Sequence, residues 1–261
     1  MNVIAGRAIA GQIAYGRLRF VRRLAPQAAE FSALSWQEES ERFARARSRA
    51  VEQLARRYER ALLAVGEEIA AVFSIHAILL EDEEFISSVL TLIRERGVTA
   101  EHAVYAVGEE LGETFFGMES NYMRARAMDI RDISCQVIRL LLERVPENPL
   151  REGPAILVAN EFLPSEIIDL DHSRLLGIIA HKGNVESHAA MLLRAYGIPA
   201  MTEVALERDW DGHLALLDGF DHKLYLDPDP SLLDTLRLRY QQAKGGLEVN
   251  KAAAESVQGT E

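Results

Sequence analysis

The spacing of apolar residues predicts a long helical region in the first half of the chain. From residue 35 onward apolar side chains recur mostly at steps of three and four, which places them on one face of an amphipathic helix: Phe43, Val51, Leu54, Tyr58, Leu62, Val65, Ile69 and Val72. Ser35 and Glu38 fit the Ser-x-x-Glu capping box, so the helix is expected to begin there. Gly66 interrupts the pattern, which keeps no strict heptad and therefore favours the core of a helix bundle over a coiled coil.

Further helical patterns extend this region to the middle of the chain. They run from Ala100 to Phe116 and from Tyr122 to Val145, after a bend at residues 73–85 in which an apolar turn leads into acidic residues. Short turns between helices are typical of an antiparallel bundle, here of four helices. Pro146 and Pro149 end the pattern, so we assign the helical part to residues 33–146.

Short apolar runs on both sides of the helical region predict buried strands. Residues 16–21 alternate with period two, and residues 155–159 and 175–180 are apolar runs of strand length. Two further strands are expected around residues 213–217 and 223–226. Because the early strand has no partner until the chain returns after the bundle, we predict a discontinuous α/β domain of residues 1–25 and 150–228. A C-terminal helix is expected over 229–244, followed by a disordered tail over 245–261.

Charge and composition argue against several classes of function. The 261 residues carry a formal net charge of −11, whereas binding to nucleic acid or to an anionic membrane requires a basic surface. A basic protein is therefore the expected partner. Cys135 is the single cysteine, which excludes an internal disulfide and a Cys metal site. No apolar run is long enough to span a bilayer and no signal peptide is visible, so we expect a cytoplasmic protein without membrane insertion.

The main candidate for chemistry is His188, at the junction of a strand, a turn and a helix. The strand of residues 175–180 is followed by a turn at Gly183, and Ser187 opens a helix that ends near Gly197. Free backbone N–H groups and the positive end of the helix dipole there suit an anionic phosphoryl or carboxylate group. A neutral imidazole in that place is a candidate nucleophile toward phosphorus. A structural histidine without chemistry is the alternative.

The order Gly183, Ser187, His188, Arg194 and Ile198-Pro199-Ala200 resembles the phosphohistidine segment shared by Enzyme I of the sugar phosphotransferase system, phosphoenolpyruvate synthase and pyruvate phosphate dikinase. The resemblance implies an α/β phosphohistidine (swivelling) domain with an inserted all-α four-helix bundle subdomain. It also implies that His188 accepts the phosphoryl group of phosphoenolpyruvate, with Gly183, Glu186, Ser187 and Arg194 in support. In Enzyme I a phosphoenolpyruvate-binding barrel domain with a magnesium site follows this region. We therefore expect no metal or cofactor in this chain. Phosphoenolpyruvate is expected to bind to a barrel domain outside this sequence, and a homodimer is expected only when that barrel is present.

A second resemblance lies in the helical part. The run from His76 to Glu84, with Leu-Leu-Glu-Asp-Glu-Glu inside it, and the run Tyr122, Arg126, Asp129, Asp132, Ile133 are similar to segments of Enzyme I. In that family the helical subdomain docks a small histidine-containing phosphocarrier protein. The resemblance implies a carrier-binding surface formed by Glu67, Glu68, His76, Leu79, Asp82, Glu83, Glu84 and Arg126. A plain structural interpretation is that the acidic residues are solvated and favoured by a helix N-terminus, and that most charges of the second run form pairs three or four residues apart.

The sequence departs from the family pattern close to the histidine. Glu186 and Ala189 stand where the family often has threonine, and Ile167 replaces the threonine of a Pro-Ser-Glu-Thr helix start. Hydroxyls that could hydrogen-bond the imidazole or its phosphoryl group are thus missing, and Glu186, if close, would raise the pKa of His188. The leading hypothesis is a phosphotransferase domain. The alternatives are a non-catalytic Enzyme I-like binding or regulatory module, and a generic α/β binding domain.

Overall fold

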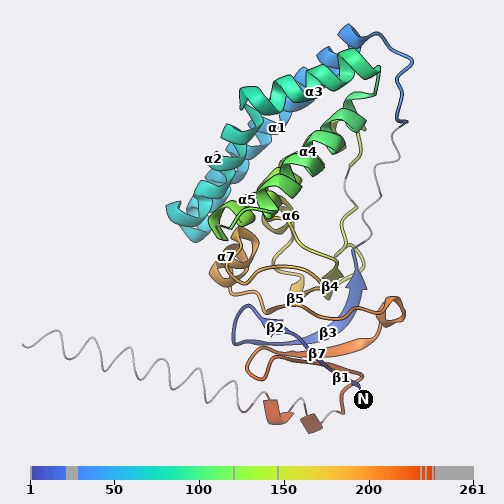
Figure 1. Ribbon diagram of the computed structural model, residues 1–261. Helices are drawn as coiled ribbons and strands as arrows, with labels where there is room; N and C mark the ends of the chain where they lie inside the picture. Colours follow the sequence, from blue (N-terminus) through green and yellow to red (C-terminus); the bar gives the residue numbers. More distant parts are fainter. Residues whose placement is uncertain are drawn as a thin grey trace, which may run out of the picture.

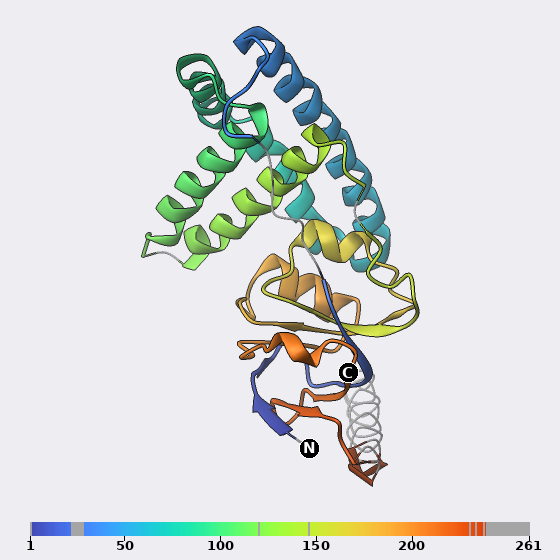
Figure 2. The same ribbon diagram turned by 90° about the vertical axis from the view of Figure 1, so that its right-hand side faces the viewer.

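The chain folds into a helical part that sits on an α/β part (Figure 1). The computed structural model describes residues 2–21, 29–119, 121–145, 147–229, 231, 232, 234–236 and 238, with the backbone alone for 121–125. Seen from the side, the helices splay apart toward the α/β part (Figure 2). No helix among these residues is long and apolar enough to cross a membrane.

Five helices make up the described helical part. They are α1 (Trp36–Val65), α2 (Glu67–Leu80), α3 (Glu83–Arg96), α4 (Ala100–Phe116) and α5 (Asn121–Leu141). The capping box predicted at Ser35 and Glu38 is present at the start of α1. The long first helix of the sequence prediction is divided, because Gly66 adopts a φ of +88° that ends α1 and begins α2. The helical part therefore contains one more helix than the predicted four.

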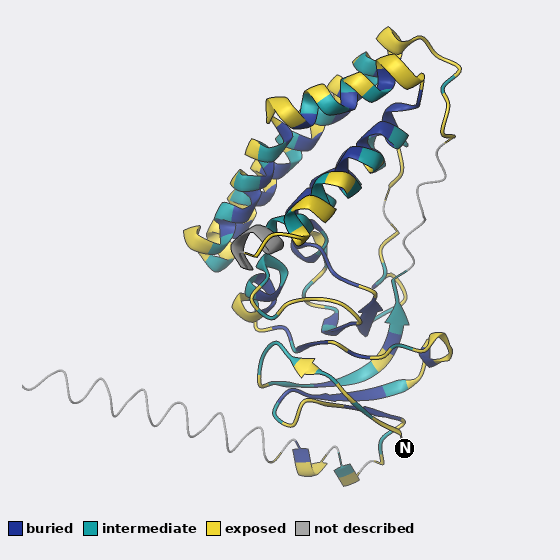
Figure 3. Cartoon of the chain, viewed as in Figure 1, coloured by how far each residue is buried: buried dark blue, intermediate teal, exposed yellow. Residues whose placement is uncertain are grey.

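The apolar stripes of these helices meet in one core. α1 packs against α2 and α5, and α4 packs along α5. The buried residues lie on the inner faces of the helices, whereas the outer faces are exposed (Figure 3). The largest of those that are almost fully buried are Phe43, Leu54, Phe73, Leu80, Phe85, Ile93, Ile130 and Ile133. The predicted bundle core is thus present.

Eight strands form one sheet in the order β1-β8-β7-β3-β4-β5-β6-β2. Their bounds are Asn2–Ala5, Arg7–Ala8, Ile13–Phe20, Ala155–Ala159, Leu175–Ala180, Ala200–Thr202, Leu214–Asp218 and Lys223–Leu226 for β1 to β8. β3 pairs in parallel with β4 and antiparallel with β7, so the first strands of the chain find their partners beyond the helical part. The exact domain boundaries stay a prediction.

The sheet curls back on itself. β1 and β2 lie at opposite ends of the strand order, yet Gly6 alone separates them in the chain. A side chain at Gly6 would meet the Met201 sulfur at 2.6 Å, so glycine is needed where the two ends approach. The curl encloses a core of its own, to which Ile156 and Val158 of β4 contribute. Leu157, on the other face of the same strand, joins the core that continues through α6 (Pro164–Asp169) and α7 (His188–Ala195) into the bundle.

The C-terminal segment is described only in part. The Asp229 carboxylate accepts a hydrogen bond from the Ser231 backbone N–H at 2.9 Å, and residues 231, 232, 234–236 and 238 are helical. The whole predicted disordered tail, residues 245–261, and the end of the predicted helix, residues 239–244, lie outside the described residues.

Candidate functional site

His188 is the first residue of α7, as the sequence predicts. The Ser187 hydroxyl caps the helix by accepting a hydrogen bond from the Ala190 N–H at 3.2 Å. Gly183 adopts a φ of +153°, and a Cβ there would lie 2.8 Å from the Thr202 hydroxyl. Arg194 donates from Nη1 to the Val185 carbonyl oxygen at 2.6 Å and so ties the loop before His188 to the far end of α7. Three of the predicted supporting residues therefore shape the backbone that presents the histidine.

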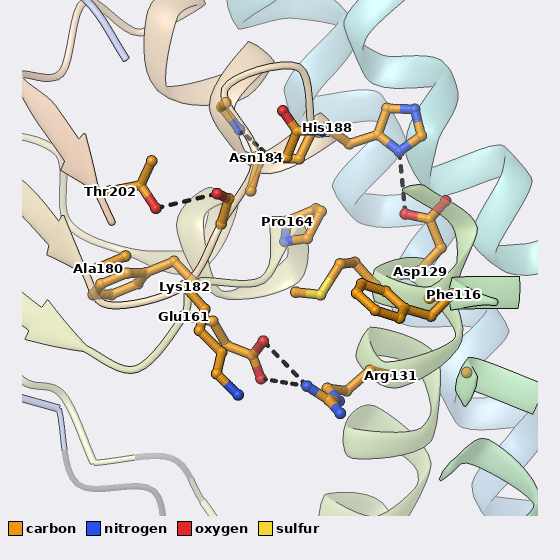
Figure 4. A pocket seen from close by; sticks show the side chains of 18 of the residues that line it. Phe116, Asp129, Arg131, Glu161, Pro164, Ala180, Lys182, Asn184, His188 and Thr202 are labelled. Carbon is orange, nitrogen blue, oxygen red and sulfur yellow. Dashed lines mark hydrogen bonds and ion pairs between the residues drawn. The ribbon is translucent and has the colours of Figure 1, made fainter. Parts of the chain in front are cut away.

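The imidazole of His188 contacts a carboxylate from the helical part. Its Nδ1 lies 3.1 Å from Oδ1 of Asp129 on α5 (Figure 4). The hydrogen bond to Asp129 raises the pKa of His188, against partial burial and the positive charge of Arg126, which lower it. Burial alone would raise the pKa of the Asp129 carboxyl, but hydrogen bonds from His188 and His76 bring it below its usual value. Asp129 is therefore ionised at neutral pH.

His76 is buried rather than exposed on a docking surface. Its side chain is 0% exposed, and Nε2 lies 3.1 Å from the same Asp129 oxygen that contacts His188. Its Nδ1 is 3.7 Å from Oδ2 of Asp132. His76 was expected among the residues that contact a carrier. In this arrangement it cannot do so, because the core of the bundle surrounds it, and it belongs to the His188 site instead.

Asp132 extends this network to the contact between the helical and α/β parts. Oδ2 accepts from the Ser165 backbone N–H at 2.9 Å, and Oδ1 accepts from the Ser165 hydroxyl and from Gln136 Nε2, the latter at 3.0 Å. Gln136 in turn accepts from Arg57, which pairs with Asp169 of α6 at 2.7 Å. Buried polar groups that are satisfied in this way fix how α6 sits on the bundle.

A cleft of about 880 Å³ opens beside His188. Helices α4 and α5 line one side, and the residues after β4 and the loop from β5 to α7 line the other. An ion pair between Arg131 of α5 and Glu161, at 3.1 Å, crosses between the two sides (Figure 4). Lys182, His181 and Asn184 add polar groups from the loop. Among the residues that the structure describes, no group of His, Cys, Asp or Glu could hold a metal ion.

The remaining residues predicted to contact a carrier lie on α2, α3 and α5. Glu67, Glu68, Glu83 and Glu84 are exposed. Asp82 is exposed too, and its carboxylate caps α3 by accepting from the N–H groups of residues 84 and 85. Leu79 and Arg126 are half-buried. The acidic groups are thus exposed at the two ends of α2, and the plain structural interpretation, a favourable place at a helix N-terminus, holds for Asp82 as well.

Glu186 does not act on His188 in the way considered from the sequence. It is exposed, and its backbone N–H donates to the Asn184 side chain at 2.9 Å. The groups that shift the pKa of His188 are Asp129 and Arg126, and Glu186 is not one of them. The sequence did contain a signal for Asp129 and Asp132, since both belong to the Enzyme I-like run, but their spacing suggested pairs along one helix.

The curled sheet, the inserted helices and the half-buried histidine at a helix start define a class of protein. The family model described as PEP-utilising enzyme, N-terminal, matches residues 5–126, and the model described as PEP-utilising enzyme, mobile domain, matches residues 151–221. The chain therefore belongs to the phosphoenolpyruvate-utilising enzymes, of which it carries the N-terminal and mobile domains. The family and fold class predicted from the sequence are confirmed.

Within this family the similar curated proteins are phosphoenolpyruvate-protein phosphotransferases. That of Bacillus sp. (strain S) is 31% identical over 214 residues, which cover 81% of this chain and 36% of the relative. That of Haloferax volcanii is 34% identical over 224 residues, which cover 84% of this chain and 38% of the relative. The chain thus spans little more than a third of the length of these relatives.

Two solved structures share the fold. An Enzyme I protein whose solution structure was determined by NMR matches with a TM-score of 0.69 and 24% identity, over 92% of this chain and 99% of that one. The N-terminal domain of a protein titled Enzyme 1 - Nitrogen matches with a TM-score of 0.60 and 26% identity, over 91% and 99% of the two chains.

Proposed function

We propose that this chain is the phosphohistidine and carrier-binding region of a phosphoenolpyruvate-protein phosphotransferase. His188 accepts a phosphoryl group from phosphoenolpyruvate, which is bound on a barrel domain outside this sequence, and passes it to a histidine of a small phosphocarrier protein. The observation that carries the proposal is the state of His188. Asp129 holds one ring nitrogen, no described residue hydrogen-bonds the other, Nε2, and the histidine lines an open cleft.

The geometry suits nucleophilic attack by Nε2. Its lone pair forms the bond to phosphorus, and the P–O bond of the donor breaks with its electron pair on the leaving enolate oxygen. In the second half of the reaction the carrier's histidine attacks the same phosphorus, and the electron pair of the Nε2–P bond returns to His188. Magnesium belongs to the phosphoenolpyruvate site in this proposal, and this chain supplies no ligand for it.

The acidic surface of α2 and α3 supports docking of a basic carrier. Glu67 and Glu68 stand at the start of α2, Glu83 and Glu84 at the start of α3, and all four are exposed. Ile78 between them is 67% exposed and offers an apolar centre. Complementary charge of this kind mainly raises the association rate. Helix α2 packs against α5 and α7, and its His76 shares an Asp129 oxygen with His188, so a carrier docked on α2 would lie near the cleft.

The test is phosphoryl transfer from a phosphorylated phosphocarrier to the chain, read by intact mass. We expect one added phosphoryl group in the wild type and none in His188→Ala. His213→Ala is the matched control, because His213 also pairs with an aspartate through Nδ1, at 2.8 Å from Asp227, but lies outside the cleft. That variant should be phosphorylated like the wild type. Carrier binding without any transfer would instead favour the non-catalytic module.

A further inference from the structure

We propose that Asp129 is a positioning residue for phosphoryl transfer: from the helical part it holds the hydrogen of His188 on Nδ1 and balances the positive charge of the phosphorylated ring. The inference rests on the proposed function of His188. It adds that the residue which prepares the nucleophile comes from the inserted helices and not from the α/β part that carries the histidine.

The hydrogen-bond pattern fixes which ring nitrogens carry hydrogen. Oδ1 of Asp129 lies 3.1 Å from both Nδ1 of His188 and Nε2 of His76. An ionised carboxylate can only accept, so both rings must donate. His188 therefore carries its hydrogen on Nδ1 and keeps the lone pair on Nε2, which is the form that can attack phosphorus. The opposite tautomer, with hydrogen on Nε2, would be unreactive there.

The contact between Asp129 and Nδ1 of His188 also suits the phosphorylated form of the histidine. When Nε2 bonds to phosphorus, the ring keeps its Nδ1 hydrogen and becomes positively charged, so no proton has to leave. The Asp129 carboxylate, with a side chain only 2% exposed, faces this new charge. In the return step the Nε2–P bond breaks and a neutral imidazole leaves, which is a better leaving group than a deprotonated ring. One carboxylate thus serves both half-reactions.

His76 explains how a carboxylate can be held in this position. It lies on α2, is fully buried, and occupies the same Asp129 oxygen as His188. Oδ2 of Asp129 has no hydrogen-bond partner within the described part of the chain, so the two histidines alone orient the group.

The first test measures the tautomer of His188 from the ¹⁵N chemical shifts of its ring. The measurement is made at a pH above the pKa of His188, where the imidazole is neutral. The wild type should be almost wholly protonated on Nδ1. Asp129→Ala should shift the population toward the Nε2 tautomer, and Asp129→Asn, whose amide oxygen can still accept, should shift it less. Asp169→Asn is the control, because Asp169 pairs with Arg57 on the same contact surface but does not touch His188. Unchanged tautomers in both Asp129 variants would overturn the inference.

The second test is the rate of phosphoryl transfer from the phosphorylated carrier across pH. The charged groups that face His188 are Asp129 and Arg126 of α5, with buried His76 of α2 behind the carboxylate. Asp129→Asn should lower the maximal rate at least about tenfold, leave carrier affinity unchanged, and move the acid limb of the profile to lower pH. Circular dichroism establishes that this nearly isosteric variant is folded.

The outcomes separate this inference from the proposed function. A wild type that takes up no phosphoryl group would refute the function, while the ring shifts would still decide the role of Asp129. A wild type that reacts, together with an Asp129→Asn variant of equal rate and equal pH profile, would leave the function standing and refute the positioning role.

Discussion

Replacing Asp132 by alanine is expected to destabilise the chain strongly, because this carboxylate joins α5 of the helical part to α6. Asp132 is 0% exposed and accepts hydrogen bonds from the Ser165 backbone N–H, the Ser165 hydroxyl and Gln136. The alanine variant leaves these donors inside the protein without partners. The Ser165 N–H is fixed at the start of α6 and cannot turn toward water.

The size of the effect follows from the number of stranded donors. Each buried polar group without a partner costs about 1–3 kcal/mol, and three neutral donors lose their acceptor here, of which the Ser165 hydroxyl can rotate. We therefore expect a loss of about 3–5 kcal/mol, which for a chain of this size lowers the melting temperature by at least about 6 °C. The measurement is thermal unfolding followed by circular dichroism, with urea unfolding as a second probe.

Asp171→Ala is the matched control for this prediction. Asp171 accepts from the backbone N–H and hydroxyl of Ser173, the same pair of donors, but it is exposed. Water can replace it, so its loss should lower the melting temperature far less. If Asp132→Ala and Asp171→Ala had equal effects, burial of the Asp132 network would not be the source of its stabilisation.

The other predictions concern the acidic surface, the pH response and the residue before the histidine. The double variant Glu83→Lys/Glu84→Lys should slow association with the carrier and weaken the salt dependence of the association rate. Unchanged kinetics in surface plasmon resonance would show that these two carboxylates do not attract the carrier. The raised pKa of His188 means that its contact with Asp129 stabilises the fold fully below the unfolded pKa of about 6.5 and loses this effect as pH rises through the folded value. The difference in melting temperature between wild type and His188→Ala should therefore be larger at pH 5.5 than at pH 9, and a difference independent of pH would contradict the contact. Glu186→Thr should leave the pH profile of phosphoryl transfer almost unchanged because Glu186 is exposed and does not shift the pKa of His188. A profile displaced toward lower pH in that variant would show that the carboxylate acts on the ring after all.

Local patterns in the sequence predict much of this fold. β4 is recognisable because all its residues are apolar, and the structure buries it on both faces, with Ile156 toward the curled-sheet core and Leu157 toward the helices. The start of α7 is likewise encoded locally, since serine is a preferred N-cap residue and the Ser187 side chain caps the helix that begins at the next residue. Signals of this kind act between neighbouring residues and need no knowledge of the rest of the fold.

The composition of the site depends on long-range packing that no local pattern records. His188 and Asp129 are 59 residues apart and meet only because the fold brings the start of α7 to α5. The place of His76 was accessible to sequence reasoning, because it lies three residues after Phe73 and four before Leu80, on the buried stripe of α2. The resemblance to a carrier-binding segment pointed to the surface instead, whereas helical periodicity pointed to the core.

The identity of the phosphorylated atom decides whether His188 reacts as proposed. After reaction with a phosphorylated carrier, the modified residue can be located by tandem mass spectrometry and the bonded nitrogen identified by ³¹P and ¹⁵N NMR at alkaline pH. We expect a single phosphoryl group on His188, attached to Nε2, with Nδ1 still hydrogen-bonded to Asp129. A phosphoryl group on Nδ1, or on any other residue of the chain, would contradict this expectation.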